Sequence, residues 1–112
     1  MEVTTENENG TLIAMAGGRI DGTNAADFEN ALQEAIGGSE AAVVLDCEEL
    51  SYISSAGLRA ILRIAKDLNR RAVKFVLCSL SDPIREVFQI SGFDKIINIH
   101  TDRGGAVSVV AS

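Results

Sequence analysis

The sequence has few of the residues that mark metal-binding, redox or disulfide-rich proteins. Among its 112 residues are two cysteines, one histidine, one proline and no tryptophan. Cys47 and Cys78 do not form a Cys-x-x-Cys motif, and nothing in the spacing brings His100 to either, so we predict no zinc site, no redox dithiol and no Cys-His nucleophile pair. Each cysteine ends an apolar run that is typical of a strand, and we interpret both as buried thiols. We therefore expect no metal and no cofactor.

Long hydrophobic runs and an excess of basic residues are also missing. No apolar run approaches the roughly 18 to 20 residues that a membrane helix requires, and residues 1–9 lack the basic and apolar regions of a signal peptide. Ten Lys and Arg stand against 16 Asp and Glu, and the formal charge is -6. Binding to a nucleic-acid backbone depends on clustered Lys and Arg. We expect a cytoplasmic protein that contacts neither nucleic acid nor membrane directly.

The hydrophobic pattern predicts an α/β fold. The length and the 46% hydrophobic content are typical of one globular domain, which we expect to span residues 1–112. Apolar runs predict strands, and apolar residues at helical spacing predict helices. The expected strands are 2–8, 11–16, 41–46, 73–78 and 96–99, and the expected helices are 23–36, 55–69, 82–91 and one starting near 101 or 102. Because parallel strands need helical crossovers, this order predicts a mixed four- to five-stranded β-sheet with about four α-helices.

The segment from residue 45 to residue 58 carries the most functional information. A strand ends at Asp46, a loop of about six residues follows, and Ser54 and Ser55 stand where a helix begins. Functional groups in open α/β sheets collect at this edge of the sheet. One interpretation is structural, because serine is a preferred N-cap. The other is that one hydroxyl is phosphorylated, since a helix N-terminus tolerates a phosphate; the two are compatible.

Enzyme chemistry is not predicted at this loop. The chain has no Gly-x-Gly-x-x-Gly, no Gly-x-x-x-x-Gly-Lys-Ser/Thr and no Gly-x-Ser-x-Gly elbow. A serine hydrolase would have to use the lone His100 as its base. A small nucleotide-binding or hydrolytic domain remains the alternative from the enzyme class, and we predict no catalytic residues.

The sequence Ile53-Ser54-Ser55-Ala56-Gly57-Leu58-Arg59-Ala60-Ile61-Leu62 resembles the STAS domain of bacterial anti-sigma factor antagonists. The resemblance extends to residues 18–21, 73–78 and 84–97, and so covers nearly the whole chain. It implies a single STAS-type domain. In that family the unphosphorylated antagonist binds an anti-sigma factor, which is also a serine kinase of the GHKL type, and thereby frees a sigma factor. Phosphorylation of a loop serine breaks the complex, and a PP2C-type phosphatase restores it.

The family motif is Asp-Ser-Ser/Thr-Gly-Leu, and the resemblance implies that Ser55 is the phosphorylated residue. Ser54 then stands in place of the motif's Asp and is the second choice as acceptor, and Ala56 replaces the second Ser/Thr. Asp21 falls on an acidic position near the acceptor serine. Because Ser54 departs from the motif, the alternative is a non-switching STAS assembly subunit of a signalling scaffold or of a lipid-transport complex.

We expect a partner to dock around the serine loop, with Tyr52, Ile53 and Leu58 forming an apolar rim. The predicted partner-binding residues are Asp21, Tyr52, Ile53, Ser54, Ser55, Ala56, Gly57, Leu58 and Arg59. Arg59 and Arg63 belong to a basic stripe on the second helix, which is either a solvated face or a contact for acidic partner residues. Asp21 either caps the first helix, closes the Asp21-Gly22 turn or lies beside Ser55.

Overall fold

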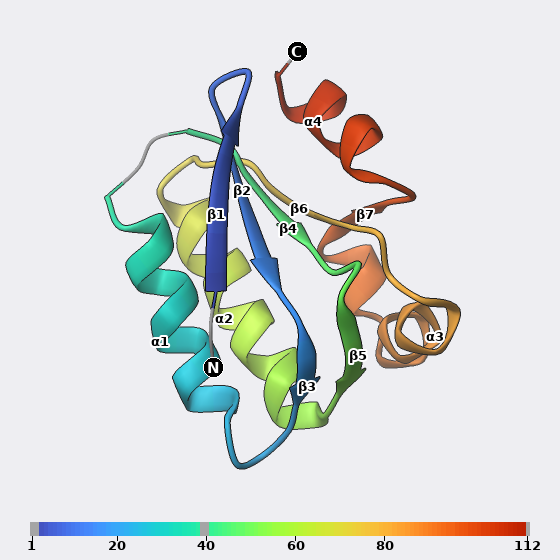
Figure 1. Ribbon diagram of the computed structural model, residues 1–112. Helices are drawn as coiled ribbons and strands as arrows, with labels where there is room; N and C mark the ends of the chain where they lie inside the picture. Colours follow the sequence, from blue (N-terminus) through green and yellow to red (C-terminus); the bar gives the residue numbers. More distant parts are fainter. Residues whose placement is uncertain (1–2, 39–40, 112) are drawn as a thin grey trace.

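The computed structural model describes residues 3–38 and 41–111, and these form two β-sheets and four α-helices (Figure 1). The larger sheet has five strands in the order β1-β2-β4-β6-β7, and the smaller pairs β3 with β5. The strands are β1 (Val3–Glu8), β2 (Thr11–Ala16), β3 (Gly18–Ile20), β4 (Val43–Asp46), β5 (Leu50–Ile53), β6 (Phe75–Cys78) and β7 (Asn98–His100). The helices are α1 (Ala25–Ile36), α2 (Ser55–Arg70), α3 (Asp82–Ser91) and α4 (Arg103–Ala111), with a short 3-10 helix η1 (Phe93–Lys95).

The five-stranded sheet is mixed, as the sequence predicts. β1 and β2 form an antiparallel hairpin whose turn residues Asn9 and Gly10 have φ of 53° and 77°, the left-handed conformation that two-residue hairpin turns require. The other pairs, β2·β4, β4·β6 and β6·β7, are parallel. All four residues of β4 are buried at the centre of the sheet, as is typical of an apolar strand that is covered on both faces.

Helices cover both faces of the larger sheet, and the buried hydrophobic cluster is larger on one face than on the other. One buried cluster joins alternate strand residues, among them Val43, Leu45 and Leu77, to the apolar faces of α1, α2 and α3. The second cluster lies on the other face and is smaller. It consists of Ile13, Val44, Val76, Cys78 and the α4 residues Ala106, Val107 and Val110. Within the described chain, α4 is therefore the only helix in the second cluster.

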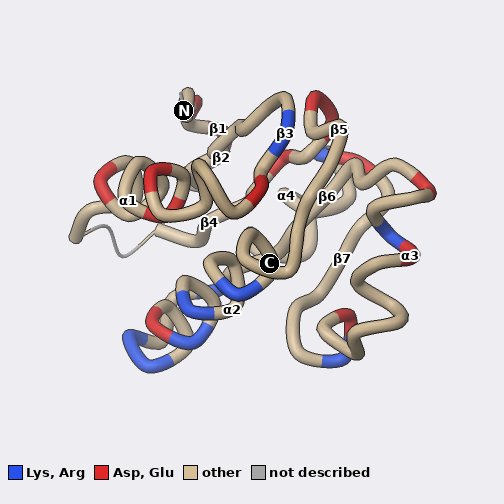
Figure 2. The backbone as a smooth tube through the Cα atoms, turned by 90° about the horizontal axis from the view of Figure 1, so that it is seen from below, with Lys and Arg blue, Asp and Glu red and all other residues tan. Residues whose placement is uncertain are grey.

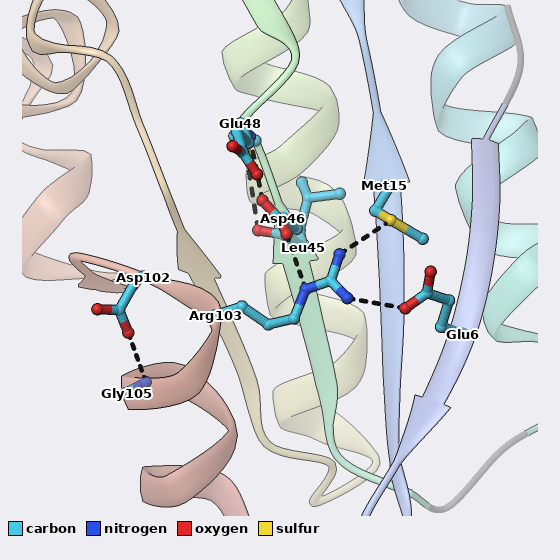
Figure 3. A network of polar contacts seen from close by, with 9 residues as sticks. Glu6, Met15, Leu45, Asp46, Glu48, Asp102, Arg103 and Gly105 are labelled. Atoms are coloured by element: carbon cyan, nitrogen blue, oxygen red, sulfur yellow. Dashed lines mark hydrogen bonds and ion pairs between the residues drawn. The ribbon is translucent and has the colours of Figure 1, made fainter.

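An ionic contact joins the start of α4 to the sheet (Figure 3). Nε of Arg103 donates to the buried carboxylate of Asp46 at 2.9 Å, and its Nη1 donates to Glu6 at 2.7 Å. The second oxygen of Asp46 accepts from the backbone N–H of Glu48 at 3.1 Å. The hydrogen bond to Asp46 raises the pKa of Arg103. A buried carboxylate needs such partners, so this contact, here called the Arg103 clasp, fixes α4 against β4 and β1.

Three details of the predicted elements are wrong. The expected loop after Asp46 contains β5, which pairs with β3, and neither strand is apparent in the apolar pattern. The last strand begins at Asn98 rather than at 96, because the chain first forms η1. The strand expected from 73 begins at Phe75. The α/β class, the number of strands in the main sheet and the four helices are confirmed.

Candidate partner-binding site

The two-stranded sheet of β3 and β5, here called the ribbon, places the start of α2 beside the turn that follows β3. Its strands are parallel, with Arg19 opposite Tyr52 and Ile20 opposite Ile53. The backbone N–H of Gly18 donates to Glu49 at 2.9 Å, and that of Ser54 donates to Ile20 at 2.8 Å. The serine loop is consequently held by strand pairing on one side and continues directly into α2.

Ser54 and Ser55 have different roles in this structure. Ser54 is the N-cap of α2, with extended φ and ψ of -90° and 174°, and its hydroxyl accepts from the N–H of Gly57 at 3.3 Å. The capping interpretation is thus confirmed for Ser54. Ser55 is the first helical residue and is exposed. In the described part of the chain its hydroxyl has no hydrogen-bond partner, so it is the freer of the two.

Gly57 allows the first turn of α2 to pack directly on the ribbon. A Cβ at this position would lie 2.7 Å from Cγ1 of Ile53 and 2.8 Å from Cγ2 of Ile20. Such distances are below any normal carbon contact, and both groups belong to branched, fully packed side chains. The glycine is therefore required by the close approach of helix and ribbon, and not by its backbone angles.

The two large exposed side chains of the ribbon are an arginine and a tyrosine. The guanidinium of Arg19 lies 4.3 Å from the centroid of the Tyr52 ring, within the range of a cation–π contact. The tyrosine remains 41% exposed. On α2, Ser55 and Arg59 are both exposed and four residues apart, so they share one face of the helix. We call Arg19, Tyr52, Ser55 and Arg59 the switch surface.

Part of the predicted partner surface lies in the core instead. Ile53 is 4% exposed and Leu58 is 6% exposed, and both belong to the main hydrophobic cluster together with the ribbon residue Ile20. Gly57 is buried as well, and Ala56 is half-buried. The expectation that Ile53 and Leu58 form an apolar rim is corrected: Tyr52 alone of the three is open to a partner. The buried residues support the surface from beneath.

Asp21 closes the turn between β3 and α1. Its carboxylate accepts from the backbone N–H and the hydroxyl of Thr23, at 2.9 and 2.5 Å, and the hydroxyl bond is the main cause of its lowered pKa. Asn24 stands at the N-cap of α1, but its side chain bonds backwards to Asp21 N and Arg19 O. Of the alternatives for Asp21, the turn is observed. The residue before the turn, Ile20, accepts a hydrogen bond from the backbone N–H of Ser54. Asp21 therefore lies in the segment next to the N-cap of α2.

The basic stripe on α2 is partly neutralised within the chain (Figure 2). Nε and Nη2 of Arg63 donate to the carboxylate of Glu29 on α1, at 2.5 to 3.0 Å. These bonds raise the pKa of Arg63. Arg63 therefore joins α1 to α2, although its side chain remains 57% exposed. Arg59, one turn nearer to Ser55, stays exposed.

The cysteines are buried and point to opposite faces of the main sheet. Cys47 belongs to the cluster beneath α1 and α2, and Cys78 to the cluster beneath α4. Burial raises the pKa of Cys47, and it raises that of Cys78 to about 11. Both thiols are protonated at neutral pH and unreactive, which confirms the interpretation as structural residues.

A cavity of about 670 Å³ adjoins the ribbon at the carboxyl end of β4. Arg19, Asp46, Glu48, Glu49 and Arg103 contribute to its walls. Arg19 and Arg103 were missed as site residues by sequence reasoning, since isolated arginines in short polar segments carry no periodic signal. Among residues 3–38 and 41–111, no three His, Cys, Asp or Glu side chains are grouped to hold a metal ion. None of the helices in those ranges has the length and apolar character to cross a membrane.

Comparison with known proteins identifies a matching family and relatives that align over nearly the whole chain. The family model described as the STAS domain matches residues 2–106. BtrV of Bordetella bronchiseptica, named as a candidate anti-sigma factor antagonist, is 41% identical over 108 residues, which cover 96% of this chain and 93% of BtrV. RsfB of Mycobacterium tuberculosis, an anti-sigma-F factor antagonist, is 26% identical over 108 residues, covering 96% and 88%.

Solved structures share the fold. A candidate anti-sigma factor antagonist from Thermotoga maritima superimposes with a TM-score of 0.90 at 20% identity, covering 98% of this chain and 95% of that one. The antagonist SpoIIAA in its unphosphorylated form gives a TM-score of 0.74 at 22% identity, covering 96% of each chain. The family match, the BtrV identity and the shared architecture agree with the resemblance at the serine loop: the chain belongs to the STAS domain family.

Proposed function

We propose that this chain is an anti-sigma factor antagonist that acts by partner switching. Its unphosphorylated form binds an anti-sigma factor that is also a serine kinase of the GHKL type, and a sigma factor is released. Phosphorylation of Ser55 ends the binding, and a PP2C-type phosphatase restores it. The chain acts in the cytoplasm as a binding module without catalytic chemistry of its own, and Ser55 is a substrate. The names of BtrV and RsfB support the antagonist role.

The observation that carries the proposal is that the two serines have different environments and different roles. Ser54 is occupied as a helix cap, whereas Ser55 is exposed at the first position of α2. A phosphate on Ser55 leaves the cap intact and lies near the positive end of the helix dipole. A phosphate on Ser54 would disturb the bond to Gly57. Ser55 is therefore favoured as the acceptor over Ser54.

The switch surface also suggests how a phosphate would end docking. A phosphoserine carries about -1.5 to -2 charges, and here it would stand one helical turn from the exposed guanidinium of Arg59. It would attract Arg59, which is otherwise available to an acidic partner residue, and it would bring a strongly hydrated group into the interface. If about 3 kcal/mol of binding free energy were lost, the affinity would fall by roughly a hundredfold.

A second function rests on Ser54. This residue stands where the family motif has an acidic side chain, and its hydroxyl is used within the chain. A kinase that reads the acidic neighbour would not phosphorylate Ser55. The chain would then be a constitutive STAS assembly subunit of a signalling scaffold or a lipid-transport complex, with the same surface permanently open.

The test compares four baits in a pull-down from native lysate: the parent protein, Ser55→Ala, Ser55→Asp and Ser54→Ala. Partner switching predicts that a GHKL-type kinase is captured by the parent, Ser55→Ala and Ser54→Ala but is absent from Ser55→Asp. The captured kinase is then purified and incubated with the parent and ATP. Mass spectrometry is expected to find one phosphate on Ser55, none on Ser55→Ala, and release of the complex.

Two results would contradict the proposal. Phosphate on the Ser55→Ala variant would move the acceptor to another residue, with Ser54 tested first through its own variant. The same set of partners on all four baits, with no phosphate transferred, would establish the assembly subunit instead.

A further inference from the structure

A second polar cavity lies at the opposite edge of the main sheet from β1. It has a volume of about 490 Å³. Its walls come from α3, η1, β7 and α4. The lining residues are Arg85, Gln89, Asp94, Asn98, His100 and the apolar Ile99 and Val109. β7 is the last strand of the sheet and pairs only with β6 within the described chain, so the cavity follows an unpaired strand edge. None of these residues belongs to the switch surface.

Two buried nitrogen atoms of this cavity lack hydrogen-bond partners. They are Nε of Arg85 and Nε2 of His100, and no group among residues 3–38 and 41–111 bonds to either of them. Arg85 and His100 are themselves only half-buried, and both side chains line the cavity. They come from different elements, yet they line the same space.

Unpaired polar atoms of this kind cost free energy. A buried donor without an acceptor forfeits its hydration, and the penalty is larger on a charged group such as guanidinium. Two such atoms on side chains that line one cavity are uncommon in folded proteins. Both nitrogen atoms remain without partners in the described part of the chain, although the neighbouring apolar residues of α3, Ile84 and Phe88, are fully buried.

The chemistry of the walls selects an anion with oxygen atoms. A guanidinium offers donors in a planar fork that fits a carboxylate or a phosphate, and the imidazole can donate from a second direction. Gln89 lies one helical turn beyond Arg85 and adds an amide. Of the described residues that line the cavity, Asp94 is the carboxylate; it is exposed and forms no hydrogen bond with Arg85 or His100.

We propose that this cavity is an oxyanion-binding site in which Arg85 and His100 hold a carboxylate or a phosphate group. The oxyanion has two sources that share this chemistry, an acidic side chain of a protein segment lying along β7 or free inorganic phosphate. The free edge of β7 favours a segment, because an extended chain can pair with it while its side chain enters the cavity. The proposal is independent of the switch at Ser55.

The test is an NMR titration at constant pH. His100 is the only histidine, so its imidazole nitrogen signals need no further assignment, and the Nε–H of Arg85 gives a second signal. The probes are inorganic phosphate and, separately, a capped glutamate-containing tetrapeptide, each with sodium chloride at equal ionic strength as reference. We expect saturable shifts of both signals with at least one probe, and the probe that binds more tightly identifies the source.

Two variants make the titration decisive. Arg85→Gln is expected to weaken the binding seen at His100 by roughly tenfold or more, and His100→Asn to weaken that seen at Arg85. Arg70→Gln removes the same charge from an exposed arginine paired with Asp67 on α2 and is expected to bind as the parent does. The proposal is overturned if neither probe gives saturable shifts, or if Arg70→Gln and Arg85→Gln lower the affinity equally.

Discussion

The main sheet and the ribbon both contain parallel strand pairs, yet they differ in how much of each strand is buried. In the main sheet all four residues of β4 are buried and lie between two helical layers. In the ribbon only Ile20 of β3 and the first and last residues of β5, Leu50 and Ile53, are buried, and Tyr52 remains 41% exposed. Burial is thus concentrated in the main sheet, and the proposed contacts with a partner lie on the ribbon and the start of α2.

The largest effect on folding is expected in the main sheet. Leu45→Ala removes a side chain that is 1% exposed at the centre of β4, and it should lower the free energy of unfolding by about 2 to 5 kcal/mol. Urea denaturation followed by circular dichroism measures it. A loss below about 1 kcal/mol would show that the centre of the sheet is less decisive than its burial indicates.

Gly57→Ala tests the junction between the ribbon and α2. An added methyl group collides with Ile53 and Ile20, so we expect a loss of about 1 to 3 kcal/mol in the free energy of unfolding. Gly104→Ala is the matched control, because its Cβ would meet nothing nearer than 3.6 Å, and it should stabilise α4 by up to about 1 kcal/mol. Equal effects of the two changes would contradict the close-approach explanation.

The two serines should differ in their effect on stability. Ser54→Ala removes the N-cap bond to Gly57 and is expected to cost about 1 kcal/mol. Ser55→Ala removes an exposed hydroxyl and should change the stability by less than about 0.5 kcal/mol. Thermal unfolding of both variants beside the parent measures the difference. If the ranking is reversed, Ser55 and not Ser54 caps the helix in solution.

Tyr52→Ala should have a small effect on folding and a clear effect on recognition. Its cation–π contact with Arg19 is exposed, and the expected loss of stability is below about 1 kcal/mol. Affinity for the captured anti-sigma kinase should fall by roughly tenfold, because exposed aromatic residues often dominate interfaces. Tyr52→Phe keeps the ring and should bind nearly as the parent does. Unchanged affinity of Tyr52→Ala, measured by calorimetry, would exclude the ribbon from the interface.

The elements that sequence reasoning identified are those whose own residues determine them. The apolar runs at 11–16 and 41–46 and the helical spacing in α1 and α2 need no distant partner to be recognised. β3 and β5 were missed because Gly18–Ile20 and Leu50–Ile53 are short and show no alternation. They become strands only because they meet each other, which is a tertiary effect.

The candidate site was predicted in outline from the serine loop, but the exposure of its residues was not. Gly57 and Leu58 are adjacent to the helix start, and only the packing of α2 against Ile20 and Ile53 shows that they are buried. Arg19 became part of the site through a strand pairing that the sequence does not reveal. The last strand begins at Asn98 and not at Ile96 for a similar reason. Ile96 is 59% exposed although its side chain is apolar, and the sequence does not reveal this exposure.

The Arg103 clasp has a consequence for the order in which the protein is made. It joins Arg103 to Glu6, residues separated by 97 positions in the chain, and α4 follows every strand of the sheet. On the ribosome, Ile13, Val44 and Val76 are therefore synthesised well before the helix that covers them. Until α4 is synthesised, these side chains lack the helix that covers them in the folded protein, so the clasp closes only after all the strands have been made.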